Sequence, residues 1–444
     1  MTKFGGGTEI ADFLSILRLI IAVQAIAGCE PQGSNSTGPV ELPTADASQA
    51  GFSVERLQHL SDTLDQLLQD NGAPGAVALI LRDGQVVYER AFGHRTPAHE
   101  QVMTTDTIFR IYSMTKPISS VAVMMLWEDG AFELDDPIGL YIPEFNSVRV
   151  AVYDESRSNI VDTVAPKRSI TITDLLRHTS GMTYGIFGAM TPVKQQYLDA
   201  DLALDTFDGD LQKWIETVAK IPLESHPGDR WQYSPATNVL GRLVEVVSGQ
   251  TLGDFLRERL FDPLDMRDTD FHVPESKHER MAEGIGQDMR GHFLKLHDVS
   301  TPPKLQTGDG GLVSTARDYA RFSQMLLNGG ELHGVRLLES ATVDMMTSDH
   351  LGPTIDVGPL YFPGQGYGFG LGFSVRLEQN LSVLPGSPGE YGWGGLAGTI
   401  GWIDPQEQLV IVFMVQDIPN IYLYRRKFKS LTYAAMIREQ DLRD

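Results

Sequence analysis

Cysteine is almost absent from this chain: Cys29 is the only one among 444 residues. A lone cysteine excludes both an intramolecular disulfide framework and a cysteine-based zinc site. The H-E-x-x-H pattern of zinc peptidases is also missing, and the acidic stretch 199–210 lacks the ligand spacing and final glutamate of a calcium loop. We therefore expect neither a metal nor another cofactor, and a fold that depends on packing alone.

Positive charge is also scarce. The chain has 36 Lys and Arg against 58 Asp and Glu, a formal net charge of −22. Such a surface repels phosphate groups, so binding to nucleic acid or to an anionic bilayer surface is not expected. Hydrophobic residues still make up 42% of the chain, which is enough for a substantial core.

The N-terminus differs in character from the rest. Residues 19–28 form an apolar run that is too short to span a membrane but typical of an export signal. The run Ile26-Ala27-Gly28-Cys29 resembles the bacterial lipoprotein box, in which the cysteine is lipidated. We predict a leader over 1–29, lipidation of Cys29, a flexible linker over 30–50, and an exported periplasmic or outer-membrane-anchored protein. A plain leader or a buried helix in a cytoplasmic protein are the alternatives.

Hydrophobic spacing outlines the domain that follows, residues 51–444. A helix is expected from Val54 to Asn71, because leucines recur there at helical intervals. Two strands, 75–81 and 85–92, flank an Asp83-Gly84 hairpin turn, and further strands are expected at 368–375, 397–403 and 409–415. A final helix is expected over 424–439. We predict an α+β fold: an antiparallel sheet built from both termini (51–112 and 347–444), flanked by helices, with an all-helical part (113–346) beside it.

Ser113-Met114-Thr115-Lys116 matches S-x-x-K, a motif of acyl-transferring serine enzymes. The motif opens a helical pattern, so Lys116 would lie about one turn after Ser113 on the same side. A serine hydroxyl attacks an acyl group only when a base takes its proton, and a lysine beside a tyrosine can supply that chemistry. Taken alone, the motif is more typical of a capping serine and a solvated lysine.

Four further blocks follow the motif in order: His178-Thr179-Ser180-Gly181-Met182, Pro227-Gly228 with Tyr233-Ser234, Gly310 to Thr315, and Tyr391-Gly392-Trp393-Gly394-Gly395 with Gly398-Thr399. With this set the chain resembles family VIII carboxylesterases, within the superfamily of class C serine β-lactamases and penicillin-binding proteins. The resemblance spans about residues 53 to 435. It implies the serine β-lactamase fold, with the active-site cleft between the α/β part and the helical part.

The resemblance also implies roles. Ser113 corresponds to the nucleophile, Lys116 to the lysine that modulates it, and Tyr233 to the general base that later protonates the leaving group. The backbone N–H groups of Ser113 and Leu396 would form the oxyanion hole, and Trp393, Gly394 and Gly395 would bind substrate. Independently of the resemblance, a strand edge without side chains lets a substrate approach the backbone closely.

Two positions depart from the β-lactamase pattern. Pro235 replaces the asparagine of Y-x-N, and Trp393 replaces the lysine of K-T-G, the cation that faces the β-lactam carboxylate. Both changes disfavour an anionic amide substrate and leave the acylation residues intact. We therefore expect a serine esterase acting on small-molecule esters with short to medium acyl chains, and the absence of G-x-S-x-G argues against an α/β-hydrolase.

Other functions and residues stay open at this stage. A class C-like β-lactamase, a D-stereospecific peptidase or amidase, and a non-catalytic penicillin-recognising protein share the same motifs. His178 is interpreted as structural. Four aromatic residues fit either an acyl pocket or the core: Trp214, Trp231, Tyr361 and Phe362.

Overall fold

The computed structural model describes residue 1 and residues 41–98, 100–284, 296–358, 360–378 and 381–438. The described residues from 41 onward form one compact unit. The helices of the described residues are α1 (Val54–Asp70), α2 (Thr115–Glu128), α3 (Ile172–Leu176), α4 (Pro192–Asp199), α5 (Leu211–Val218), α6 (Ala236–Ser248), α7 (Leu252–Leu256), α8 (Ala316–Leu327), α9 (Ser340–Met346) and α10 (Ile421–Ala435).

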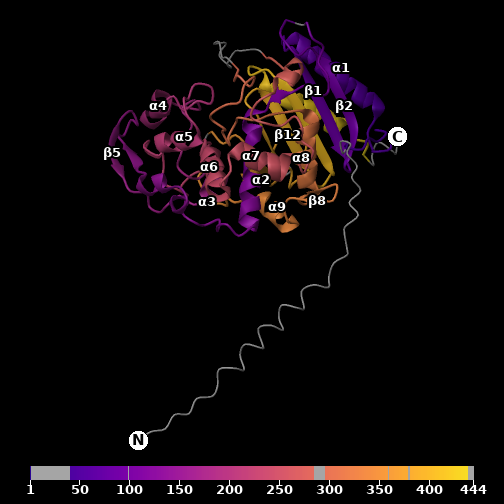
Figure 1. Cartoon of the computed structure of the whole chain (residues 1–444). Helices are drawn as coiled ribbons and strands as arrows, with labels where there is room; N and C mark the ends of the chain where they lie inside the picture. Colours follow the sequence, from indigo (N-terminus) through magenta and orange to yellow (C-terminus); the bar gives the residue numbers. More distant parts are fainter. Residues whose placement is uncertain (2–40, 99, 285–295, 359, 379–380, 439–444) are drawn as a thin grey trace. The chain divides into compact units, whose positions relative to one another are not determined.

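A seven-stranded antiparallel sheet dominates the α/β part (Figure 1). Its strands, in spatial order, are β2 (Gln85–Gly93), β1 (Gly75–Arg82), β13 (Leu409–Gln416), β12 (Gly398–Asp404), β11 (Tyr391–Gly394), β10 (Ser374–Arg376) and β9 (Tyr367–Phe369). Three short pairs lie outside it: β3 (Phe109–Arg110) with β6 (Val313–Ser314), β4 (Val150–Tyr153) with β5 (Ile160–Val164), and β7 (Glu331–Leu332) with β8 (Val335–Arg336). The predicted sheet from both termini is confirmed.

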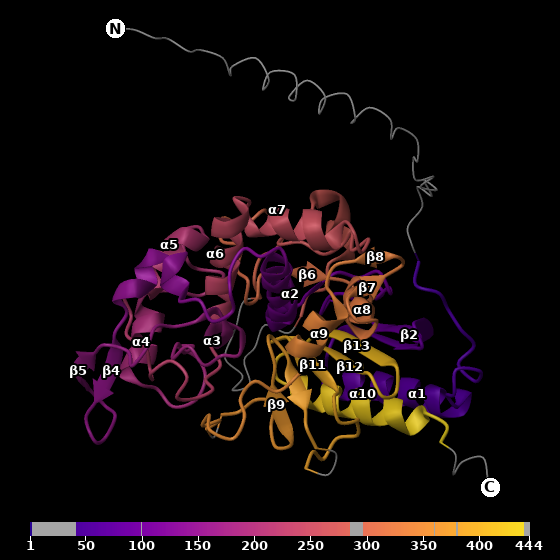
Figure 2. The same ribbon diagram turned by 90° about the horizontal axis from the view of Figure 1, so that it is seen from below.

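The two faces of the sheet are covered by different helices. In β1, Ala76, Ala78 and Ile80 pack with α1 and α10 on one face, and the alternate residues Val77 and Leu79 join the main core on the other. Figure 2 shows α1 and α10 side by side below the sheet, with α8 and α2 on the opposite side. This alternation follows from the two-residue period of a strand, and it leaves β1 and β13 buried on both faces.

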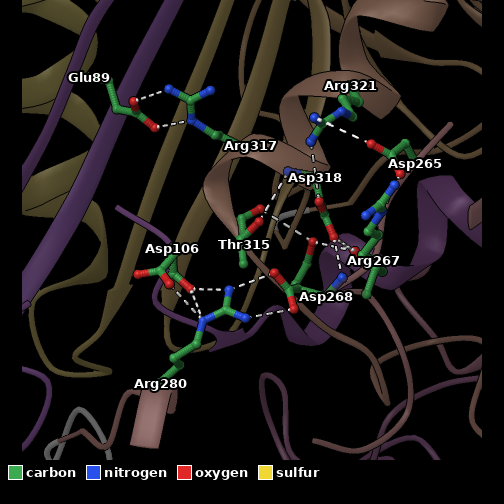
Figure 3. Close-up of polar contacts among 12 residues, drawn as sticks. Glu89, Asp106, Asp265, Arg267, Asp268, Arg280, Thr315, Arg317, Asp318 and Arg321 are labelled. Atoms are coloured by element: carbon green, nitrogen blue, oxygen red, sulfur yellow. Dashed lines mark hydrogen bonds and ion pairs between the residues drawn. The ribbon is translucent and has the colours of Figure 1, made fainter. Parts of the chain in front are cut away.

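Helix α8 is tied to the sheet and to the neighbouring loop by polar contacts (Figure 3). Arg317 donates two hydrogen bonds to the Glu89 carboxylate on β2, at 2.8 and 2.6 Å. On another side of the helix, Asp318 accepts a hydrogen bond from the Asp268 N–H at 2.8 Å. Although α8 falls within the range predicted for the helical part, 113–346, it packs against β1, β12 and β13. The apolar face of α8, which includes Tyr319 and Phe322, is buried against the sheet.

Three expected boundaries differ from the structure. The predicted strand 368–375 is two short strands, β9 and β10, because Gly372 has a φ of +99° and the chain reverses there. The final helix begins at Ile421 and ends at Ala435 rather than spanning 424–439. The predicted flexible linker, 30–50, is ordered in its last ten residues: Leu42 is buried, and Pro43 O accepts a hydrogen bond from Val86 N.

Candidate active site

Ser113 lies in a 3₁₀ turn, Tyr112–Met114, directly before α2. The turn is entered from β3, which is held by its pairing with β6. Tyr112, the residue just before the serine, has a φ of +43°, a left-handed conformation that is uncommon for a bulky residue. This sharp turn brings Ser113 to the wall of the cleft described below.

Lys116 is buried on the first turn of α2, with 2% of its surface exposed. Its Nζ donates hydrogen bonds to Ser113 Oγ at 3.3 Å, Tyr184 Oη at 2.9 Å and the Asp309 carbonyl at 2.7 Å. These three acceptors match the three donors of an ammonium group. Lys116 therefore has one defined orientation, directed at the serine hydroxyl, and the alternative of a solvated lysine is wrong.

Tyr233 faces the same lysine from the helical part. Its ring centroid lies 4.9 Å from Lys116 Nζ, and its hydroxyl accepts a hydrogen bond from Trp393 Nε1 at 3.1 Å. Pro235 is the N-cap of α6, so it ends the irregular segment that carries Tyr233. The structure thus brings Ser113, Lys116, Tyr233 and Trp393 together from separate stretches of the chain.

Two polar residues of this site, Tyr184 and Asp309, were not predicted from the sequence. Tyr184 Oη donates to the Asp309 carboxylate at 2.5 Å and accepts from Lys116. Burial raises the pKa of Tyr184 well above its ordinary value, and the charge of Asp309 adds to the effect, so this tyrosine is a neutral phenol. The only local signal for these residues was their position beside the His178–Met182 and Gly310–Thr315 blocks.

His178 lies behind Tyr233 rather than in the cleft. Its ring is 5.0 Å from the Tyr233 ring and 5.4 Å from that of Phe369, and it is 2% exposed. Burial lowers the pKa of His178 well below its ordinary value, and Lys116 lowers it further, so the imidazole is neutral. This environment agrees with the structural role expected from the sequence.

The turn after β11 carries the other predicted residues. Gly394 ends β11, Gly398 begins β12, and Gly398 N donates to Gly395 O at 3.1 Å, which closes a turn around Leu396. A Cβ at Gly395 would lie 2.2 Å from Ile111 O, and one at Gly394 would lie 2.7 Å from Arg425 Cζ. Both positions therefore require glycine because neighbouring protein atoms leave no room for a side chain, whether or not a substrate also approaches there.

A cleft of about 460 Å³ opens beside Ser113. Its walls include Tyr233, Trp393, Gly394, Gly395 and Leu396. Phe362 also lines it, whereas Trp231 and Tyr361 pack behind in the aromatic cluster around Tyr233. Trp214 is 1% exposed and belongs to the main core. Of the four aromatic residues that fitted either an acyl pocket or the core, only Phe362 therefore lines the cleft.

Cys29, the predicted lipidation site, lies outside the described residues. Over the described ranges, the helices are all too short or too polar to cross a bilayer.

Comparisons with known proteins agree with this fold. The beta-lactamase family model matches residues 60–426. An uncharacterized protein of Mycobacterium tuberculosis (strain CDC 1551 / Oshkosh) is 33% identical over 357 residues, covering 78% of this chain and 86% of the relative. The esterase EstB of Burkholderia gladioli is 30% identical over 380 residues, covering 82% of this chain and 90% of the relative.

Among solved structures, EstCE1, a hydrolase with promiscuous acyltransferase activity, matches with a TM-score of 0.70 and 24% identity. The match covers 85% of this chain and 99% of EstCE1, which extends the likeness in fold to almost the whole of that protein. The order of the motifs, the fold and the extent of the family match lead to one assignment: this chain belongs to the beta-lactamase family and is a serine hydrolase.

Proposed function

We propose that this protein is a carboxylesterase that hydrolyses small-molecule esters with short to medium acyl chains through an acyl-enzyme on Ser113. The observation that carries the proposal is the hydrogen bond from the Trp393 indole to Tyr233 Oη. A neutral indole stands where a β-lactamase has a lysine, so the cleft lacks that cation for a substrate carboxylate. The similarity to the esterase EstB of Burkholderia gladioli supports the same substrate class.

In the proposed reaction, Ser113 Oγ attacks the acyl carbon and its proton passes to the Tyr233 oxygen. The new Oγ–C bond forms as the carbonyl electron pair moves onto oxygen, where the N–H groups of Ser113 and Leu396 would stabilise it. The ester C–O bond then breaks, and Tyr233 returns the proton to the departing alcohol. A water molecule repeats the sequence on the acyl-enzyme and releases the acid and free Ser113.

In this cycle Lys116 positions the Ser113 hydroxyl and stabilises negative charge on the Tyr233 oxygen. Its ammonium holds Ser113 Oγ at 3.3 Å and lies 4.9 Å from the centre of the Tyr233 ring. A cation at that place stabilises the negative charge that the phenolic oxygen carries when it acts as a base. Tyr184 and Asp309 complete the orientation of the ammonium, since both accept from it.

Turnover of p-nitrophenyl butyrate tests the proposal. We expect steady hydrolysis by the wild type, loss of it in Ser113→Ala, and retention in Ser120→Ala, which removes a buried hydroxyl from the same helix. Undiminished turnover by Ser113→Ala would refute the role of Ser113. Comparable efficiency on nitrocefin would indicate a β-lactamase instead, and a single stoichiometric burst would indicate a penicillin-recognising protein without turnover.

We also propose that the protein is exported and anchored through a lipid on Cys29. The lipoprotein-box sequence before Cys29 supports this, together with the absence of any other cysteine that could be modified. Labelling of growing cells with a fatty-acid analogue should mark the wild type and leave Cys29→Ser unmarked. A cytosolic wild-type protein with an intact N-terminus would contradict the proposal.

A further inference from the structure

Arg425 reaches from α10 to the turn between β11 and β12. Its Nη2 donates hydrogen bonds to Gly395 O and to Thr399 O, the latter at 2.8 Å, and its Nε donates to Gly398 O at 3.3 Å. The acceptors are backbone carbonyls on both sides of Leu396. One guanidinium therefore bridges the two ends of the turn that holds the predicted oxyanion-hole donor.

The Gly395 carbonyl and the Leu396 N–H belong to the same peptide group. A peptide group is planar and trans, so its oxygen and its N–H point in opposite directions and rotate together. Within the described part of the chain, the Leu396 N–H donates to no backbone or side-chain acceptor. Arg425 and Gly398 N hold the oxygen on one side, which leaves the N–H available on the other.

The charge of Arg425 adds a second effect. Burial lowers its pKa to about 10, which still leaves the guanidinium charged at neutral pH. A cationic donor on a carbonyl draws electron density toward the oxygen and makes the N–H of the same peptide a stronger donor, because linked hydrogen bonds polarise one another.

Glycine at position 394 permits this contact. A Cβ there would lie 2.7 Å from Arg425 Cζ and 2.8 Å from the Nη2 atom that makes the hydrogen bonds. Any side chain at 394 would push the guanidinium away from the turn. The Gly394 position and Arg425 are thus two parts of one arrangement.

We infer that Arg425 is a positioning residue for the oxyanion hole: it orients and polarises the Gly395–Leu396 peptide so that the Leu396 N–H binds the developing oxyanion. This inference rests on the proposed esterase function. It predicts that Arg425 affects the transition state and the acyl-enzyme carbonyl more than substrate binding.

The test compares Arg425→Met, Arg425→Lys and the control Lys427→Met, an exposed position on the same helix. For p-nitrophenyl butyrate, we expect kcat to fall about tenfold to a hundredfold in Arg425→Met with little change in KM, somewhat less than loss of an oxyanion donor itself. Arg425→Lys, which keeps the charge but bridges fewer carbonyls, should lie between it and the wild type. Lys427→Met should match the wild type.

Infrared spectra of the acyl-enzyme formed with p-nitrophenyl cinnamate supply a readout that loss of folding alone would not produce. The acyl carbonyl stretch should move to higher frequency in the Arg425 variants, because a weaker oxyanion hole polarises the carbonyl less. If Arg425→Met does not fold, Arg425→Lys carries the same comparison. Equal kcat and equal carbonyl frequency in the Arg425 variants and Lys427→Met would overturn the inference. Undiminished turnover by Ser113→Ala would instead overturn the proposed function.

Discussion

At the residue scale, the proposed catalytic pair, Ser113 and Lys116, lies within one short stretch of the chain, whereas the side chains that contact the pair come from distant stretches. Ser113, in the 3₁₀ turn, and Lys116, in the first turn of α2, are three residues apart, so local helical spacing alone brings them to the same side. Tyr184, Asp309 and Arg425 reach the site from other elements and have no motif of their own. Sequence analysis could therefore predict the pair, but not the side chains that orient it.

Tyr184→Phe tests this support. The change removes one acceptor of the Lys116 ammonium and leaves the Asp309 carboxylate without its phenolic donor. A lost buried hydrogen bond of about 1 to 1.5 kcal/mol predicts a roughly tenfold fall in kcat. Removing the proposed base in Tyr233→Phe should lower kcat about a hundredfold or more.

Tyr361→Phe is the matched control for Tyr184→Phe, because its ring belongs to the same aromatic cluster and its buried hydroxyl has no hydrogen-bond partner among the described residues. Steady-state kinetics on p-nitrophenyl butyrate would measure all three variants. Equal kcat for Tyr184→Phe and the wild type would show that Lys116 needs no support from this hydroxyl.

Protonation of Asp318 makes the stability of the folded protein depend on pH. Burial raises its pKa to about 6 from an ordinary 3.8, and the nearby charge of Asp268 contributes (Figure 3). The folded state therefore binds the proton more tightly than the unfolded state, so this residue's contribution to stability is present below pH 4 and is lost as the pH rises to about 6. Relative to Asp318→Asn, the wild type should lose about 2 to 3 kcal/mol of unfolding free energy over that range.

Urea unfolding of the wild type and Asp318→Asn at several pH values between 4 and 7 measures the effect. Other carboxylates titrate in both proteins, so the difference between the two curves isolates position 318. If the unfolding free energies of the two proteins changed with pH in parallel, the raised pKa of Asp318 would be contradicted.

At the element scale, the turn between β11 and β12 holds Leu396, the proposed oxyanion-hole donor. Strand β11 is short and glycine-rich, and its bounds could not be predicted from the periodicity of the sequence. In the structure, Gly395 lies against the carbonyl of Ile111, two residues before the proposed nucleophile Ser113. The contact joins the turn at the end of β11 to the 3₁₀ turn of Ser113.

Gly395→Ala should break that contact. Its Cβ would lie 2.2 Å from Ile111 O and 2.3 Å from Thr399 Oγ1, so the turn must move. Because a displacement of about 1 Å can cost a hundredfold in rate, we expect kcat/KM to fall by about that factor. Gly310→Ala is the control, since a Cβ there would lie at an ordinary 3.8 Å from the Tyr112 carbonyl carbon. Similar ester hydrolysis by the two variants would refute the expectation.

At the scale of the whole molecule, the compact unit begins before the boundary expected from composition. Ala45 N donates to Val86 O at 3.0 Å, and Val86 N donates to Pro43 O at 2.7 Å, so this segment runs along the edge strand β2. Covering an edge strand protects its unpaired backbone groups. Serine, proline and alanine gave a linker-like composition, yet the sheet edge orders these residues.

A protein that starts at Glu41 should therefore be more stable than one that starts at Gly51. The shorter protein loses the burial of Leu42 and both hydrogen bonds to Val86. Together these predict a loss of about 2 to 4 kcal/mol of unfolding free energy, measured by urea denaturation. Ester hydrolysis should change little, because the segment is on β2, at the opposite edge of the sheet from β9 and β10. Equal urea midpoints for the two proteins would mean that residues 41–50 contribute nothing to the unfolding free energy.

The sequence by itself determined the elements whose signals are local: the α1 helix, the Asp83-Gly84 hairpin, the apolar strands β12 and β13, and the S-x-x-K motif. Periodicity and turn chemistry act over a few residues, so one chain segment contains all the information. Only the tertiary structure decided which face of the sheet α8 covers, that Tyr184 orients Lys116, and that Arg425 holds the Gly395–Leu396 peptide. Those contacts join residues far apart in the chain, and their partners are set by packing rather than by any local pattern.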